Sequence, residues 1–199
     1  MRFTLMNAVI AGVAIVLTVG CSSSLDEANR AATTVEQPRV VTYGVPRTPQ
    51  STVLLLRRLS EAHLFLTAVD LYEPRIINVI GRDNLIGLLG AMAPTVGATD
   101  VLLIEKQRVG REVALVLRGR IQAKPVLLSY VLRPHHGQWK VLYDSMINDS
   151  LGAYIQAQFK AKFGSGTRKL RRRAKAAGTA AVLKYQRAVI ASGAPIPRR

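Results

Sequence analysis

The sequence predicts an α+β domain in which helical segments are followed by an antiparallel sheet. Apolar residues recur at helical spacing over 49–66, which favours an amphipathic helix. Between residues 101 and 146 the sequence instead favours four strands, and the side chains of residues 112–121 alternate with the period of a strand. A leader precedes this domain and a basic stretch follows it. We therefore divide the chain into a signal peptide (1–20), a flexible tether (21–47), the α+β domain (48–147) and a helical basic C-terminal extension (148–199).

The first 21 residues have the pattern of an export signal that ends in a cysteine. Arg2 gives a positive start, and residues 6–19 are almost wholly apolar. An apolar run of this length is typical of a secretory signal peptide and is short for a helix that spans a membrane. The stretch that ends in Gly20-Cys21 resembles the lipobox of bacterial lipoproteins, although Thr18 stands where that class prefers leucine.

The lipoprotein resemblance implies an exported protein anchored to the cell membrane. Cleavage after Gly20 would leave Cys21 as the first residue, with a diacylglyceride on its sulfur. Acyl chains such as palmitate contribute about 0.8 kcal/mol per buried CH₂, so several chains hold a protein on a bilayer. The alternatives are an uncleaved signal anchor, or a conventional cut near Gly20 with Cys21 incidental.

Cysteine and histidine usage argues against disulfides and metal sites. Cys21 is the single cysteine of the 199-residue chain, so the domain must depend on its apolar core. His63, His135 and His136 are too scattered for a metal site, and no motif for a cofactor is present.

Positive charge is concentrated at the C-terminal end. The chain carries a net charge of +16, and residues 151–199 contain 12 Lys/Arg and no acidic residue. Such a balance favours anionic partners. Outside the cytoplasm these are anionic lipid or envelope polymers. If the chain is not exported, nucleic acid becomes the first alternative.

The predicted domain begins with a helix at Pro49, with Thr48 as its N-cap. Arg57, Arg58 and Glu61 are expected on the side of this helix that faces away from the core. The apolar stripe consists of Leu55, Leu56, Leu59, Ala62, His63 and Leu66.

Three further elements are predicted before residue 97. A short helical stretch over 67–72 ends before Glu73-Pro74. Residues 75–80 are rich in β-branched side chains, which predicts a short strand. Asp83 is expected to cap a helix that runs through Met92.

Four strands are predicted next, and a helical region follows them. The strands cover 101–106, 112–121, 126–133 and 139–146, and the His135-His136 pair lies in the last hairpin loop. Asn148 or Asp149 is expected to cap a helix that breaks at 164–166. A basic amphipathic helix then runs from about 167 to about 191, with an apolar stripe of Leu170, Ala174, Ala177, Ala181, Tyr185 and Val189.

The order of these elements resembles the nuclear transport factor two-like (SnoaL-like) superfamily. The resemblance covers about residues 49–147 and is carried by Tyr72-Glu73-Pro74, the short run after it, Gly81 and a last strand that contains Trp139. It implies a cone-shaped fold in which N-terminal helices pack on a curved antiparallel sheet. Its members include isomerases, dehydratases and non-catalytic accessory domains, and similar folds often form homodimers through the sheet.

The sequence favours binding over catalysis. An isomerase or dehydratase would need an acid or base of perturbed pKa in the cone pocket with a hydrogen-bond donor opposite. Asp144 is a further candidate for that role, but no residue stands in a recognisable catalytic motif. The candidate pocket residues are His63, Asp70, Tyr72, Tyr130 and Tyr143.

We therefore expect a lipid-anchored binding or accessory module. Its predicted partners are membrane lipid through Cys21, a small apolar ligand or a protein, and an anionic surface. The predicted residues for that surface are Arg168, Lys169, Arg171, Arg172, Arg173 and Lys175.

Overall fold

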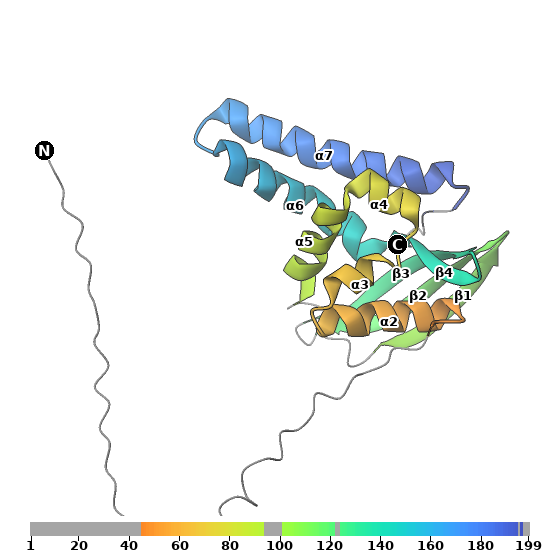
Figure 1. The fold of residues 1–199 in the computed structure, drawn as a ribbon. Helices are drawn as coiled ribbons and strands as arrows, with labels where there is room; N and C mark the ends of the chain where they lie inside the picture. Colours follow the sequence, from red (N-terminus) through yellow and green to blue (C-terminus); the bar gives the residue numbers. More distant parts are fainter. Residues whose placement is uncertain (1–44, 94–100, 122–123, 195, 197–199) are drawn as a thin grey trace, which may run out of the picture. The chain divides into compact units, whose positions relative to one another are not determined.

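The computed structural model describes residues 45–93, 101–121, 124–194 and 196. The predicted signal peptide, Cys21 and the tether up to residue 44 lie outside the described residues. The described part is an α+β domain with a four-stranded antiparallel sheet and helices (Figure 1). The coarse prediction of fold class is therefore confirmed.

Four described helices come before the sheet in the chain. They are α2 (Pro49–Glu61), α3 (Phe65–Val69), α4 (Pro74–Ile80) and α5 (Arg82–Met92). The predicted start of α2 is confirmed, because the Thr48 hydroxyl accepts a hydrogen bond from the Ser51 backbone N–H at 3.1 Å. The Ser51 hydroxyl in turn accepts one from the Thr48 N–H, which satisfies a second free donor of the first turn.

The strand predicted over 75–80 is wrong, since these residues form α4. Pro74 occupies the first helical turn, where its missing N–H costs nothing. The Glu73 carboxylate accepts a hydrogen bond from the Arg75 backbone N–H at 3.0 Å and caps the helix. These start signals outweigh the β-propensity of the branched side chains, which is weak and depends on context.

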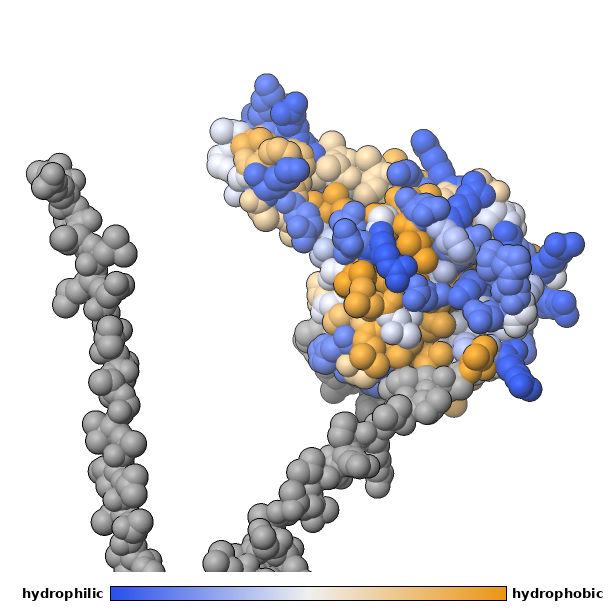
Figure 2. Space-filling model, viewed as in Figure 1, coloured by the Kyte–Doolittle hydropathy of each residue, from blue (hydrophilic) through white to orange (hydrophobic). Residues whose placement is uncertain are grey.

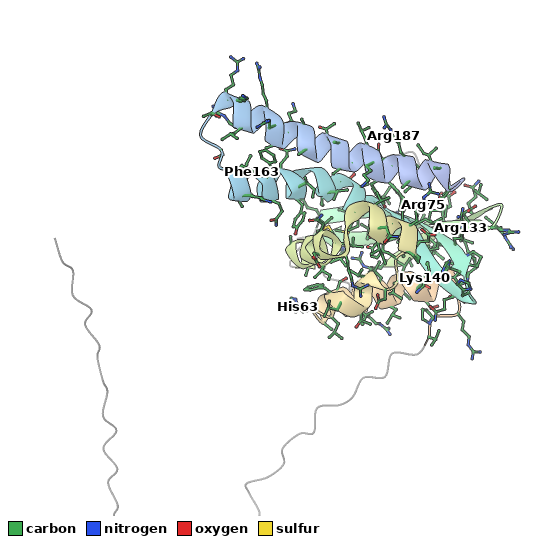
Figure 3. All side chains as sticks on the ribbon, turned by 45° about the horizontal axis from the view of Figure 1, so that its top comes forward. His63, Arg75, Arg133, Lys140, Phe163 and Arg187 are labelled. Carbon is green, nitrogen blue, oxygen red and sulfur yellow. The ribbon has the colours of Figure 1, made fainter. Side chains whose placement is uncertain are left out.

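The prediction of which residues of the first helix face the core is partly wrong. Two residues expected on the buried side are exposed, and one expected on the solvent side is buried. α2 ends at Glu61, and His63 adopts a φ of 57°, so the stripe does not continue to His63 and Leu66. Both of these side chains are exposed (Figure 3 shows His63 at the outer end of the helix). Arg57, which was expected on the solvent side, is only 4% exposed.

The sheet has the strand order β1-β2-β3-β4, and every neighbouring pair is antiparallel. The strands are β1 (Leu102–Val109), β2 (Glu112–Ile121), β3 (Lys124–His135) and β4 (Gln138–Asp144). The bounds of β2 are those predicted, whereas β4 ends two residues early. Leu115 pairs with Tyr130 on the face that α2 covers, and both side chains are buried. Tyr72, which follows α3, forms a parallel bridge to Val141 at the β4 edge.

Two helices follow the sheet, α6 (Ser145–Phe163) and α7 (Arg168–Ala191). Asp144 caps α6, so the predicted caps at Asn148 and Asp149 are wrong. The two helices form an antiparallel hairpin that extends away from the sheet (Figure 1). They approach closely where Gly178 faces Gly152, since a Cβ on Gly178 would lie 2.4 Å from the Gly152 carbonyl oxygen.

The far end of α7 belongs to the same core as the sheet. Tyr185 and Val189 are fully buried in it. The Arg133 guanidinium on β3 binds both the Glu112 carboxylate and the carbonyl oxygen of Ser192, the residue that follows α7. This contact ties the end of α7 to the sheet, so the hairpin is held at its base.

None of the described helices combines the length and the apolarity that a membrane crossing requires.

Candidate functional site

A small pocket lies between α2, the end of α5 and the sheet. Its volume is ≈ 30 Å³, about the space of one water molecule. Most of its wall is apolar, and the polar groups come from four residues of distant parts of the chain. The lining residues are Leu56, Arg57, Ser60, Leu89, Met92, Ala93, Tyr130, Asp144 and Met146.

Arg57 brings a buried positive charge to this pocket. Its Nη1 donates a hydrogen bond to the Tyr130 hydroxyl at 3.2 Å. Its Nε is buried and has no hydrogen-bond partner within the described part of the chain. The Asp144 carboxyl group lines the same pocket and interacts electrostatically with the guanidinium, but no ion pair joins the two side chains. A buried N–H group without an acceptor costs about 1–3 kcal/mol, and more when the group is charged, so this arrangement needs an explanation.

Asp144 brings a buried carboxyl group to the same pocket. One of its oxygens accepts a hydrogen bond from the Tyr72 hydroxyl at 2.8 Å. The other accepts from the backbone N–H groups of Met146 and Ile147 at 2.9 and 3.5 Å, which is how it caps α6. Burial raises the pKa of the Asp144 carboxyl, and the hydrogen bonds from Tyr72 and Met146 and the charge of Arg57 offset only part of that rise.

Three buried phenols surround the carboxyl group. Burial and the neighbouring Asp144 together raise the pKa of Tyr72, Tyr130 and Tyr185 above the ordinary value of tyrosine. For Tyr130 the Arg57 charge opposes the rise. All three therefore stay neutral. The Tyr185 hydroxyl accepts a hydrogen bond from the Asp144 backbone N–H at 2.9 Å, which joins α7 to the cluster.

The structure brings together only part of the predicted pocket. Tyr130 lines it, and Tyr72 reaches it through Asp144. Tyr143 is buried on the other side of β4 and stacks on Tyr185, with ring centroids 6.2 Å apart. Neither His63 nor Asp70 lies at the pocket, because both are exposed.

Each of these two residues has a local contact instead. The Asp70 carboxylate forms an exposed ion pair with Arg82 at 2.8 Å. The His63 ring packs edge-on against Phe65.

Sequence reasoning missed Arg57 as a site residue. The signal was its spacing, because Val53, Leu56, Arg57 and Ser60 follow an i, i+3, i+4, i+7 pattern and all four are buried. The neighbouring leucines suggested a different buried face of the helix, and Arg57 does not lie on that face. Tyr185 was expected at a buried position of α7, which is confirmed, but its hydrogen bond to the Asp144 backbone was not foreseen.

The predicted basic residues gather at the free end of the helix hairpin. Arg168, Lys169, Arg171, Arg172, Arg173 and Lys175 are all exposed on α7. Figure 2 shows hydrophilic side chains around an apolar patch at this end of the molecule. The prediction that this helix runs to Ala191 is confirmed.

No metal site is found in the described ranges, where no group of three or more His, Cys, Asp or Glu side chains could hold an ion. His135 and His136 lie in and beside the β3–β4 turn, with ring centroids 4.4 Å apart.

Comparison of the chain with protein-family models, with curated proteins and with solved structures finds no match. The function must therefore be argued from the site itself.

Proposed function

We propose that the chain is an exported, lipid-anchored binding module whose pocket holds a small molecule with an anionic oxygen group and a short apolar part. The observation that carries this proposal is the buried Arg57 guanidinium, whose Nε has no partner among the described residues. A ligand oxyanion would supply the missing acceptor through a charge-assisted hydrogen bond.

The remaining walls suit the apolar part of such a ligand. Leu56, Leu89, Met92 and Met146 surround the pocket beyond the guanidinium. The present volume holds little more than a water molecule, so a ligand must displace side chains when it enters. Methionine side chains are flexible and adapt to irregular shapes, and two of them line the pocket.

Calorimetric titration of the full chain with butanoate, hexanoate and butyl phosphate tests the proposal, with 1-butanol as the uncharged control. We expect the anions to bind and the alcohol not to bind. Arg57→Met should weaken anion binding about tenfold to a hundredfold, since a hydrogen bond to a charged group is worth about 1.5–3 kcal/mol. Arg58→Met, at the exposed neighbouring position, is the matched control and should bind normally. Equal losses in the two variants would count against the proposal.

A second candidate function is acid–base catalysis of the isomerase or dehydratase kind. It is favoured by Asp144, a buried carboxyl of raised pKa that lines the pocket beside Arg57 and Tyr130. Against it, both carboxylate oxygens already accept hydrogen bonds within the protein. Exchange of the α-hydrogens of a small ketone in heavy water would test it. Catalysis predicts exchange that Asp144→Asn abolishes, whereas a binding module gives only the uncatalysed rate.

The location of the protein is proposed from the leader alone. We propose cleavage before Cys21 and acylation of its sulfur, supported by the short basic start, the apolar run and the cysteine at its end. Intact mass spectrometry of the membrane fraction tests this. The wild type should lack residues 1–20 and carry acyl chains, and Cys21→Ala should do neither. A wild-type product that begins at Met1 in the cytosol would exclude the anchor.

We further propose that residues 49–147 adopt the cone-shaped arrangement of the nuclear transport factor two-like superfamily. Support comes from the antiparallel four-stranded order, from α2 on one face of the sheet and from the pocket between them. An experimental structure that shows a flat sheet without an enclosed end would contradict it.

A further inference from the structure

We infer that the free end of the α6–α7 hairpin docks on the surface of an anionic lipid bilayer, with its cations on the head groups and the Phe163 ring in the interface. We call residues 159–175 the hairpin tip. This inference rests on the proposed lipid anchor, which would bring a bilayer within reach of the domain.

The charge of the hairpin tip is of a single sign. Eight cations lie on it, and no acidic residue occurs anywhere between 151 and 199. All eight side chains are exposed, whereas Ala174 between them is fully buried against α6. The cations therefore occupy the outer side of the hairpin. They are Lys160, Lys162, Arg168, Lys169, Arg171, Arg172, Arg173 and Lys175.

An apolar surface lies among these cations. Phe163, the last residue of α6, is 53% exposed, and its ring centroid lies 4.7 Å from that of Phe159 (Figure 3). The Lys162 ammonium lies 5.4 Å from the centroid of the Phe163 ring. A shallow hollow beside them is lined by Phe159, Phe163, Leu170, Arg173 and Ala176. Exposed aromatic rings among cations are typical of protein segments that lie in the membrane interface.

The chemistry of the hairpin tip suits lipid better than nucleic acid. Contacts of cations with the phosphates of nucleic acid need no apolar surface beside them. A second hollow begins at the tip and continues along the exposed side of α7. Arg172 and Lys175 line it together with Ala176, Thr179, Ala180 and Leu183. Alkyl and ring carbons beside cations match head groups above acyl chains.

The contacts of α6 and α7 also hold the hairpin tip in a fixed position relative to the sheet. The backbones of α6 and α7 are in close contact at Gly152 and Gly178, and the base of α7 is fixed to the sheet through Arg133. The tip lies at the end of the hairpin remote from the sheet (Figure 1), and none of the residues that line the Arg57 pocket belongs to the tip. Docking by the tip would therefore leave the Arg57 pocket uncovered.

A tryptophan reporter tests the inference directly. Trp139 is the chain's single tryptophan, so the full chain with Trp139→Phe and Phe163→Trp carries one reporter, at the tip. The probe is this chain reconstituted in vesicles that contain brominated lipid, either neutral phosphatidylcholine alone or a mixture with phosphatidylglycerol. We expect strong quenching of the fluorescence in the anionic vesicles and little in the neutral ones, and about 1 M salt should reverse it. The unaltered chain, whose tryptophan lies on β4, should show no such difference.

Charge variants separate docking from anchoring. Neutralising Arg171, Arg172 and Arg173 to Gln should weaken the tip's association with anionic vesicles about a hundredfold, because each cation near such a surface is worth about fivefold. The matched control removes the same charge from exposed positions of the sheet region, Arg111, Arg118 and Arg120, and should change little. Repeating the comparison with Cys21→Ala distinguishes the two proposals, since an acyl anchor can fail while charge-dependent quenching persists.

Two results would overturn the inference. One is quenching that does not depend on lipid charge or on the three tip arginines. The other is tighter binding of a mixed-sequence RNA than of anionic vesicles at about 0.15 M salt, which would assign the tip to nucleic acid.

Discussion

The contact between α6 and α7 predicts opposite effects for two glycine-to-alanine substitutions. In a helix interior this change normally raises stability by about 0.5–1 kcal/mol, because alanine loses less backbone entropy. At Gly178, however, the new Cβ would lie 2.4 Å from the Gly152 carbonyl oxygen and 2.8 Å from Cγ of Gln156. The first of these is a backbone atom and cannot move without separating the helices.

The size of the effect follows from these distances. Overpacking of this kind costs about 1–3 kcal/mol, so Gly178→Ala should lower the free energy of unfolding by about 1–2 kcal/mol after the entropy gain. Gly90 in α5 is the matched control, since its nearest neighbour would be a Phe65 ring carbon at 3.5 Å, an ordinary contact. Gly90→Ala should therefore raise the free energy of unfolding by about 0.5–1 kcal/mol.

Urea unfolding of the two variants and the wild type, followed by circular dichroism, measures both changes. The sign is the decisive quantity. If Gly178→Ala stabilises the chain as Gly90→Ala does, then α6 and α7 do not approach closely, and the hairpin does not hold its tip in a fixed position.

Two further predictions concern charged groups at the sheet. Because burial raises the pKa of Asp144 above its ordinary value of 3.8, folding takes up a proton, and the free energy of unfolding should fall as pH rises from about 4. In urea-unfolding measurements between pH 3.5 and 7, Asp144→Asn, which keeps a helix cap, should reduce this fall of the unfolding free energy with pH. An unchanged slope would contradict the assignment of the pH dependence to Asp144. Arg133→Met should lower the free energy of unfolding by about 2–3 kcal/mol, since it leaves the buried Glu112 carboxylate without its cation. Arg82→Met, which breaks an exposed ion pair with Asp70, should cost less than about 1 kcal/mol, and equal costs would refute the distinction.

The sheet could be predicted from the sequence because its signals are local. The alternation over 112–121 gives the bounds of β2, and Gly164 marks the end of α6. The cap of α2 could be read in the same way, from the hydroxyl of Thr48 and the proline after it. In each case a short-range pattern and the tertiary structure agree.

The errors arise where two signals compete. The β-branched run over 75–80 has strand propensity, but Glu73 and Pro74 start a helix there. Hydrophobicity placed Arg57 on the solvent side of α2, although its spacing from Val53 and Ser60 puts it on the buried face. A charged residue on such a face is easily dismissed, because a buried charge is rare unless something binds it.

The partners of the buried groups could not be predicted because they are far apart in the chain. Tyr72 and Asp144 are separated by 72 residues, and Arg57 and Tyr130 by 73. No periodicity links such positions. Only the folded sheet and the helix on it bring the guanidinium, the carboxyl and the phenols together.

The central claim is that the buried Nε–H group of Arg57, which has no acceptor among the described residues, donates a hydrogen bond to an anionic ligand. The most direct measurement is the ¹H–¹⁵N NMR signal of that group in the full chain, assigned by its loss in Arg57→Lys, during titration with butanoate. Our account predicts a saturable downfield shift of this signal as the N–H acquires an acceptor, while 1-butanol leaves it in place. A signal that does not move with any of the anions, or that exchanges freely with water throughout, would contradict the account.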